Sequence, residues 1–143
     1  MFSKAFTLVE LILVVVIIGM VALFAIPNYN KAVTSAKEKA ASDNLRMIYS
    51  AQRLRFSTMS LYYPSTATTA DTAGINQNLN LGVVSCDSPY SCTGTNGSTF
   101  SCMASNASAP FYLRVNQTNG TPCCSDSAGT GSANNCLSAS PCP

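Results

Sequence analysis

The chain of 143 residues contains no histidine and only six carboxylates. Without histidine it lacks the commonest general base and cannot build a zinc site of mixed Cys and His ligands. It also has no glycine-rich phosphate loop and no Cys-x-x-Cys pair of the redox or zinc-binding kind. We therefore expect no catalytic residue, no cofactor and no metal. A membrane-anchored redox enzyme that uses the adjacent Cys123 and Cys124 is a remote alternative.

Charge is also scarce, at 10% of the residues and a formal net value of +2. Residues 31–56 carry six basic and two acidic side chains, a local charge of +4, and Arg114 is the only basic residue after them. A net charge this small does not indicate binding to nucleic acid. DNA is thus a partner that the sequence does not indicate, and we interpret the basic residues as the solvated side of a helix.

What the chain has in abundance is one apolar run, Phe6–Ile26, with a single carboxylate, Glu10, near its beginning. As a helix the run would span about 30 Å, the thickness of a bilayer core. It is apolar on all sides, which suits lipid or the centre of a helix bundle. Gly19 and Pro27 are its weak points. Because Pro27 lacks an N–H and crowds the carbonyl of Leu23, we expect the helix to loosen just before it.

Residues 29–56 predict an amphipathic helix. Apolar side chains recur there at helical spacing, and we expect them to pack against the C-terminal domain. This predicted stripe consists of Val33, Ala36, Ala40, Met47, Ala51 and Leu54, widened by Leu45, Ile48, Tyr49 and Phe56. Tyr62-Tyr63-Pro64 ends the helical pattern.

All the cysteines lie in the C-terminal part, residues 57–143, which has few large apolar side chains to form a core. Cysteines concentrated in a small, loop-rich segment are typical of a disulfide framework made in an oxidising compartment. The candidates are Cys86, Cys92, Cys102, Cys123, Cys124, Cys136 and Cys142. Their number is odd and their pairing is open. The adjacent Cys123 and Cys124 would point apart in an extended chain, so we expect them to have separate partners.

Short strands are predicted at residues 99–104, 109–116 and about 122–126, with turns at Asn96-Gly97 and Asn119-Gly120. Residues 65–80 are predicted to be a loop, with a helical turn around residues 75–81. The predicted fold class is α+β. A long N-terminal helix, apolar in its first half and amphipathic in its second, packs on a small, disulfide-stapled antiparallel β domain with few strands.

The segment Lys4-Ala5-Phe6-Thr7-Leu8-Val9-Glu10-Leu11-Ile12, with the apolar run that follows, closely resembles the N-terminus of the type IV pilin and pseudopilin family. The resemblance covers roughly residues 4–55. It implies cleavage between Ala5 and Phe6 by a prepilin peptidase, and N-methylation of the new Phe6 amine. Ala5 stands where the family more usually has glycine. The implied organisation is a leader at 1–5, a transmembrane and filament-core helix at 6–28, an amphipathic helix at 29–56 and a globular head at 57–143.

The resemblance implies a structural subunit of a type IV pilus. Such a subunit lies in membrane lipid, is extracted by inner-membrane assembly machinery, and polymerises with copies of itself or sister pilins into an extracellular filament. The alternative is a pseudopilin of a type II secretion system, which forms a periplasmic piston fibre. Family pilins also loosen the helix between positions such as Gly19 and Pro27 on entering the fibre.

Among packed apolar helices a carboxylate needs a partner, and the Phe6 ammonium of a neighbouring subunit is the obvious cation for Glu10. We therefore expect Phe6 and Glu10 to be the residues of subunit assembly.

The lysines around the apolar run give a conflicting signal on topology. Lys31, Lys37 and Lys39 outnumber Lys4 and the N-terminal amine, which by the positive-inside rule would place the C-terminal part in the cytoplasm. The cysteine framework and the processing motif indicate the reverse. We expect a single-pass protein of the bacterial inner membrane, with its C-terminal domain outside the cytoplasm before assembly.

Overall fold

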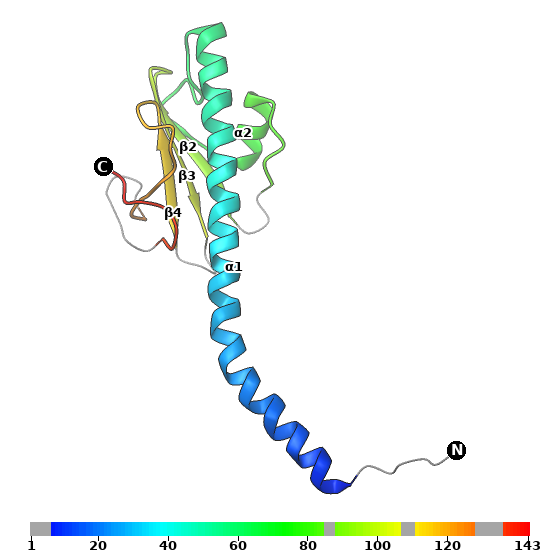
Figure 1. Ribbon diagram of the computed structural model, residues 1–143. Coiled ribbons are helices and arrows are strands. Elements are labelled where there is room, and N and C mark those ends of the chain that lie inside the picture. The colour runs from blue at the N-terminus through cyan, green and yellow to red at the C-terminus, as the bar shows by residue number, and fades with distance from the viewer. Residues whose placement is uncertain (1–6, 85–87, 107–110, 128–135) are drawn as a thin grey trace. The chain divides into compact units, whose positions relative to one another are not determined.

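The computed structural model describes residues 7–84, 88–106, 111–127 and 136–143, and at residues 24–27 it describes the backbone alone. The chain divides into two compact units, Met1–Thr34 and Ser35–Pro143, and one long helix, α1 (Leu8–Met59), contributes to both. In the second unit α1 packs on an antiparallel sheet of five strands (Figure 1). The predicted α+β class, with one long N-terminal helix and a small disulfide-bonded β domain, is confirmed.

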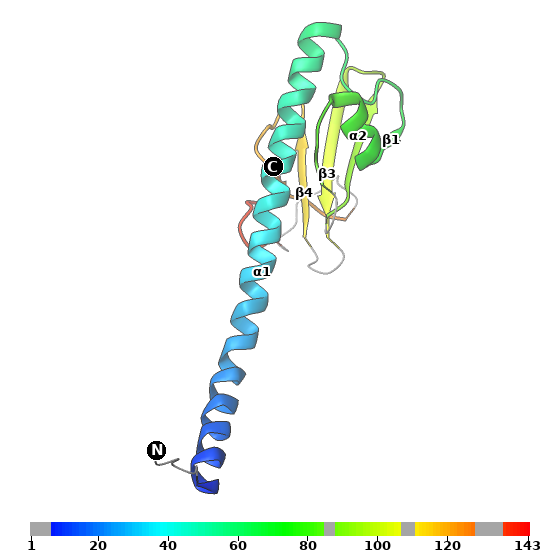
Figure 2. The ribbon, with the colours of Figure 1, turned by 90° about the vertical axis from the view of Figure 1, so that its right-hand side faces the viewer.

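The sheet is a meander in which each strand pairs antiparallel with the next one along the chain. The elements after α1 are β1 (Thr69–Ala70), α2 (Thr72–Leu79), β2 (Tyr90–Thr95), β3 (Thr99–Ser105), β4 (Tyr112–Asn116) and β5 (Cys123–Cys124). The second view shows β3 and β4 running alongside the C-terminal part of α1 (Figure 2). The short helix α2 contacts β1, an edge strand of the sheet, and its neighbour β2.

Helix α1 is continuous through Gly19 and Pro27. It ends where Ser60 takes a left-handed conformation, with φ of 56°, close to the Tyr62-Tyr63-Pro64 stop that the sequence predicts. A side chain at position 19 would meet nothing within 4 Å. The loosening of the helix between these two residues therefore stays a prediction about the assembled state.

The side of α1 that packs on the sheet is not the predicted stripe. Its buried residues recur at intervals of three and four, as one face of a helix requires. They are Glu38, Ala41, Leu45, Ile48 and Gln52. The widening residues Leu45 and Ile48 thus belong to the core, as expected.

The predicted core stripe itself is wrong at most of its positions. Ala36 and Ala40 are exposed, Met47 is 48% exposed and Leu54 is 67% exposed. At about 100° per residue these positions lie roughly two-fifths of a turn around α1 from the buried face. The helix carries two apolar stripes, and the sheet covers the one that contains Leu45 and Ile48. Spacing alone could not choose between them.

The inner face of the sheet supplies the other half of the core. Residues alternate between buried and half-buried along β3 and β4, as the pleat of a strand dictates. The buried set contains Tyr90 and Cys92 on β2, Phe100, Cys102 and Ala104 on β3, and Leu113 and Val115 on β4. Tyr62, just after α1, packs its ring on Phe100 with centroids 4.8 Å apart.

The strand predictions hold for β3, for the described part of the 109–116 segment, and for β5 within 122–126. The Asn96-Gly97 turn is also confirmed, because both residues have positive φ, 50° and 68°. It joins β3 to a strand that the sequence did not predict, β2. That strand reads Tyr-Ser-Cys-Thr-Gly-Thr and lacks the apolar alternation that marks most strands. Its Gly94 fits because an added Cβ would lie 2.3 Å from the carbonyl oxygen of Pro64.

Residues 65–80 form more structure than the predicted loop and single turn. They contain β1 and the eight-residue helix α2, which begins three residues before the predicted turn, at Thr72 rather than around Ile75. Asp71 caps the helix by accepting a hydrogen bond from the backbone N–H of Gly74 at 2.9 Å. Asn80 ends it in the left-handed conformation that favours asparagine and glycine.

Two amide side chains hold loops of the head, because each accepts from the N–H and donates to the carbonyl of one loop residue. Buried Gln52 of α1 accepts from the Tyr63 N–H at 2.8 Å and donates to the Tyr63 carbonyl. Asn76 of α2 makes the same pair of bonds to Val83, at 2.9 and 2.7 Å. Each loop is thereby pinned at one residue, with its buried backbone groups satisfied.

The predicted disulfide framework is present in the described residues. Cys92 pairs with Cys102 at directly opposite positions of β2 and β3. Cys123 pairs with Cys142, and Cys124 with Cys136. The adjacent cysteines of β5 thus have separate partners, as predicted, and both tie the C-terminal segment to the sheet. Cys86 lies outside the described residues.

Candidate assembly site

The N-terminal part of α1 exposes apolar side chains on every side. Between Leu8 and Leu23 the exposed fractions of its large apolar side chains run from 46% at Val14 to 74% at Leu23. Within the described residues α1 is the one helix with a stretch long and apolar enough to cross a membrane, judged by length and composition. This surface is stable only in lipid or against other apolar helices.

Glu10 forms a reciprocal capping box with Thr7 at the start of α1. The Glu10 carboxylate oxygen Oε2 accepts from the Thr7 backbone N–H at 3.0 Å and from the Thr7 hydroxyl at 2.9 Å. In return the Thr7 hydroxyl oxygen accepts from the Glu10 backbone N–H at 3.3 Å. Thr7 is therefore the N-cap and Glu10 the third helical residue, the arrangement that satisfies the free N–H groups of a helix start.

This geometry gives the carboxylate a partner within its own subunit and directs it toward the N-terminal end of the helix. Within the described residues, its second oxygen, Oε1, accepts no hydrogen bond. The positive end of the helix dipole lies at the same place and favours the negative charge. The site can thus present a carboxylate to a cation at the level of the helix start.

Ala5 and Phe6, the predicted processing and methylation residues, lie outside the described residues. The cleavage, the methylation and the pairing of Glu10 with a Phe6 ammonium therefore remain predictions.

The role of Thr7 was missed, although the sequence contained a signal for it. Thr7-x-x-Glu10 before an apolar run is the sequence signature of a capping box. The interpretation from sequence gives Glu10 only a partner in another subunit.

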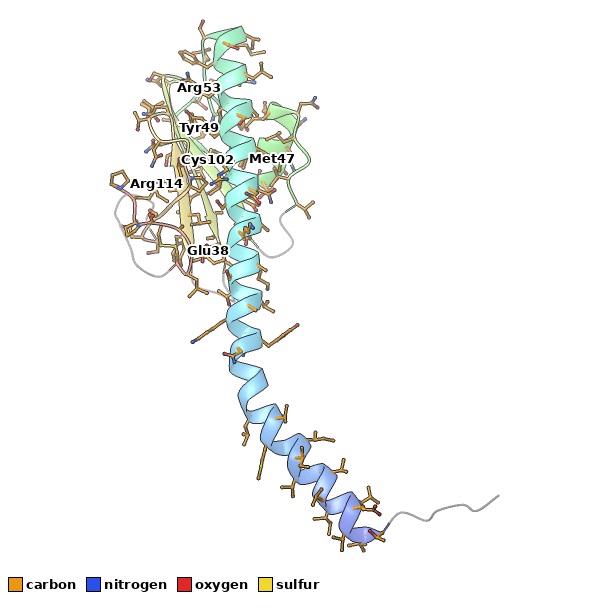
Figure 3. The ribbon with its side chains drawn as sticks, in the orientation of Figure 1. Glu38, Met47, Tyr49, Arg53, Cys102 and Arg114 are labelled. Carbon is orange, nitrogen blue, oxygen red and sulfur yellow. A yellow bond between two sulfur atoms is a disulfide. The ribbon has the colours of Figure 1, made fainter. Side chains whose placement is uncertain are left out.

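A second carboxylate of α1 was also missed. Glu38 is 1% exposed and lies on the side of α1 that faces the C-terminal segment (Figure 3). Its oxygens accept from the backbone N–H groups of Leu137, Ser138 and Ala139 at 2.7, 2.9 and 2.8 Å, and from the Ser138 hydroxyl at 2.8 Å. No sequence signal could find it, because Glu38 stands between two lysines and resembles a solvated position.

Burial acts to raise the pKa of Glu38, but the hydrogen bonds from Leu137, Ser138 and Ala139 outweigh it and leave the pKa below its ordinary value of 4.5. Donors that bind the ionised form stabilise it. The carboxylate is therefore charged at neutral pH.

The exposed apolar stripe of α1 borders a shallow groove of about 420 Å³. Its lining is almost wholly apolar, with Met47, Ala51 and Leu54 from α1 and Leu81 from the segment after α2. In Figure 3 Met47 and Glu38 are labelled on different sides of the helix. The groove thus lies on a different side of α1 from Glu38, between α1 and Leu81 of the head.

Comparison with known proteins finds a relative in Myxococcus xanthus (strain DK1622), the type IV major pilin protein PilA. The two are 43% identical over 60 residues. The chain is thus similar to a type IV pilin over that stretch. The match covers 42% of this chain and 27% of the Myxococcus protein, so it spans about a quarter of the length of that pilin. No family model matches the chain, and no solved structure matches it.

The pilin relationship agrees with the family resemblance expected from residues 4–55. It supports a pilin-like structural subunit with an apolar N-terminal helix.

The capping box yields a prediction about the start of α1. In the full-length protein in detergent micelles, Thr7→Val should remove the N-cap and destabilise the first turn by about 0.5–2 kcal/mol. The amides of Glu10 and Leu11, which donate to Thr7, should then lose protection against hydrogen exchange, measured by NMR. Thr7→Ser keeps the hydroxyl and should retain the protection. Equal protection in the valine and serine variants would contradict the capping role.

Proposed function

We propose that this chain is a pilin, a structural subunit that polymerises through α1 into an extracellular type IV pilus filament. The observation that carries the proposal is a helix surface apolar on all sides, with a carboxylate held at its N-terminal end by Thr7. A simple membrane anchor has no use for that carboxylate. A filament does, because a charge pair between subunits fixes their axial register.

The proposed mechanism has two stages. In the inner membrane the capping box satisfies Glu10 in part, which lowers the cost of holding a carboxylate near the end of the apolar segment. After a prepilin peptidase removes residues 1–5, assembly machinery extracts the subunit. Glu10 then pairs with the Phe6 ammonium of a neighbouring copy or a sister pilin.

We propose further that the exposed stripe of α1 in the head serves the same assembly. Met47 and Leu54 are large apolar side chains that the sheet leaves exposed, and Ala36, Ala40 and Ala51 nearby are small enough for another helix to approach closely. Three basic residues lie beside the stripe at intervals of seven: Lys39, Arg46 and Arg53. A second copy of the chain is the occupant that we propose for this stripe.

The charge-pairing step is tested by substitution of Glu10. Glu10→Gln should leave the protein in the membrane but lower the yield of filaments about tenfold or more, because the Phe6 ammonium would then be buried without a counter-charge. Filaments are counted by electron microscopy of sheared surface material. Glu10→Asp keeps the charge and should retain more filaments than Glu10→Gln. Filaments of normal number and length from the glutamine variant would refute the mechanism.

The stripe is tested separately from Glu10. Met47→Lys and Leu54→Lys replace exposed side chains, so the stability of the head should change by no more than about 0.5 kcal/mol. Filament yield should nevertheless fall, because a lysine would be buried between subunits. Ser57→Lys, at an exposed position of α1 outside the stripe, is the matched control and should assemble normally. If the two stripe variants assemble as well as the control, this surface is not an interface.

Processing and the kind of fibre are tested together. Mass spectrometry of sheared surface fibres should find this chain without residues 1–5 and with one methyl group on Phe6. Long extracellular fibres that contain the chain support the pilus. Short fibres confined to the periplasm would identify a pseudopilin of a type II secretion system instead. A mature protein that retains Met1–Ala5 would contradict the processing step.

A further inference from the structure

The C-terminal segment, residues 136–142, is held to the rest of the head by two kinds of contact. On the sheet side, Cys136 and Cys142 are disulfide-bonded to β5. Two backbone hydrogen bonds join the segment to Cys124, from the Cys124 N–H to Ser140 at 2.7 Å and from the Cys142 N–H to Cys124 at 2.9 Å. These bonds tether the segment to β5 whatever happens at α1.

On the helix side Cys136 and Ala139 pack against the core, and hydrogen bonds from the segment converge on one side chain, Glu38. Four hydrogen bonds run from this segment to the Glu38 carboxylate of α1. Three consecutive backbone N–H groups and one hydroxyl converge on its two oxygens, which is the anion-binding concavity known as a nest. The partners are about 100 residues apart in the chain.

No cation shares this carboxylate within the described part of the chain. An ion pair elsewhere on α1 joins Asp43 to Arg46. Lys37 and Lys39 flank Glu38 along α1 and form no ion pair with it, and the segment itself contributes only the hydroxyls of Ser138 and Ser140. The strands to which the segment is attached contribute three further titratable or charged side chains. Tyr112 and Arg114 alternate with the buried Leu113 and Val115 on β4, and Asp126 follows β5.

We propose that Glu38 is an acid-sensitive latch that holds the C-terminal segment on α1 while it is ionised and releases it when it is protonated. A protonated carboxyl carries no charge to attract four donors, and it adds a donor of its own that meets only other donors. The disulfides keep the released segment on β5, so release is local and reversible. This inference does not rest on the proposed assembly function.

The direction of the pH dependence follows from the hydrogen bonds. Because the folded protein binds the ionised form, the attachment is fully present above 4.5, the ordinary carboxyl pKa, and is lost as the pH falls through the lowered pKa. Below that point each further pH unit reduces the ionised fraction about tenfold. Release also exposes the end of the core at Glu38 and Ala41 and opens the groove of about 370 Å³ that Ser138 and Ala139 form with Lys39.

The test is hydrogen exchange of the full-length, disulfide-bonded protein in detergent micelles between pH 7 and pH 3, corrected for the intrinsic pH dependence of exchange. The amides of Leu137, Ser138 and Ala139 should be protected at neutral pH and lose protection in acid below 4.5. Amides of β3 should stay protected throughout. Loss of β3 protection at the same pH would show global unfolding and overturn the latch.

Three variants separate the latch from a merely structural contact. Glu38→Gln has the same shape without the charge, so its 137–139 amides should exchange rapidly at every pH. Asp43→Asn removes an exposed carboxylate of the same helix and should titrate like the wild type. Ser138→Ala removes one donor to the ionised form, so its release should move to higher pH.

Wild-type protection that is unchanged between pH 7 and pH 3 would overturn the proposal, as would a Glu38→Gln variant that titrates like the wild type. Should Glu38→Gln fail to fold, Ser138→Ala decides the question, and an unchanged midpoint in that variant would also overturn it.

Discussion

A carboxylate taken out of water must be given hydrogen-bond donors or a cation, and α1 carries two such carboxylates. Glu10 begins an apolar segment and accepts from Thr7. Glu38 is buried in the head and accepts from three consecutive backbone N–H groups and a hydroxyl. Within the described residues neither is paired with a cation. One helix thus uses the same chemistry twice, to define its own beginning and to hold the far end of the chain against its side.

The head depends on this solution because its apolar core is thin. Leu45 and Ile48 of α1 meet Phe100, Leu113 and Val115 of the sheet, and polar or covalent contacts do much of the rest. Gln52 pins the loop after α1, and two disulfides pin the C-terminal segment to β5. A small domain with few large apolar side chains cannot be stable on burial alone. It is therefore stabilised by disulfides and hydrogen bonds at the points where loops return to the core.

The sequence predicted the parts of this molecule that rest on local pattern. The apolar helix, the α+β class, the strand at 99–104 and the separate partners of Cys123 and Cys124 all follow from composition, alternation and spacing. The buried face of α1, the strand β2 and the role of Glu38 do not, since each is decided by what packs against it. Ser, Thr and Gly in β2 carry no apolar alternation, and the donors for Glu38 lie about 100 residues away. The Thr7–Glu10 cap is the exception, a local signal that was present and was overlooked.

The exposed apolar stripe of α1 has a sequence pattern that the fold of the head does not use, and we propose that it serves a partner. Met47 and Leu54 have the spacing of core residues, yet the sheet covers Leu45 and Ile48 instead. A helix that packed only within its own head would need one apolar stripe, and the second one costs solubility if nothing covers it. The same argument applies to the N-terminal part of α1, whose apolar side chains are exposed all round. In both places we propose that the exposed surface is covered by contacts outside the single subunit, in lipid or between copies.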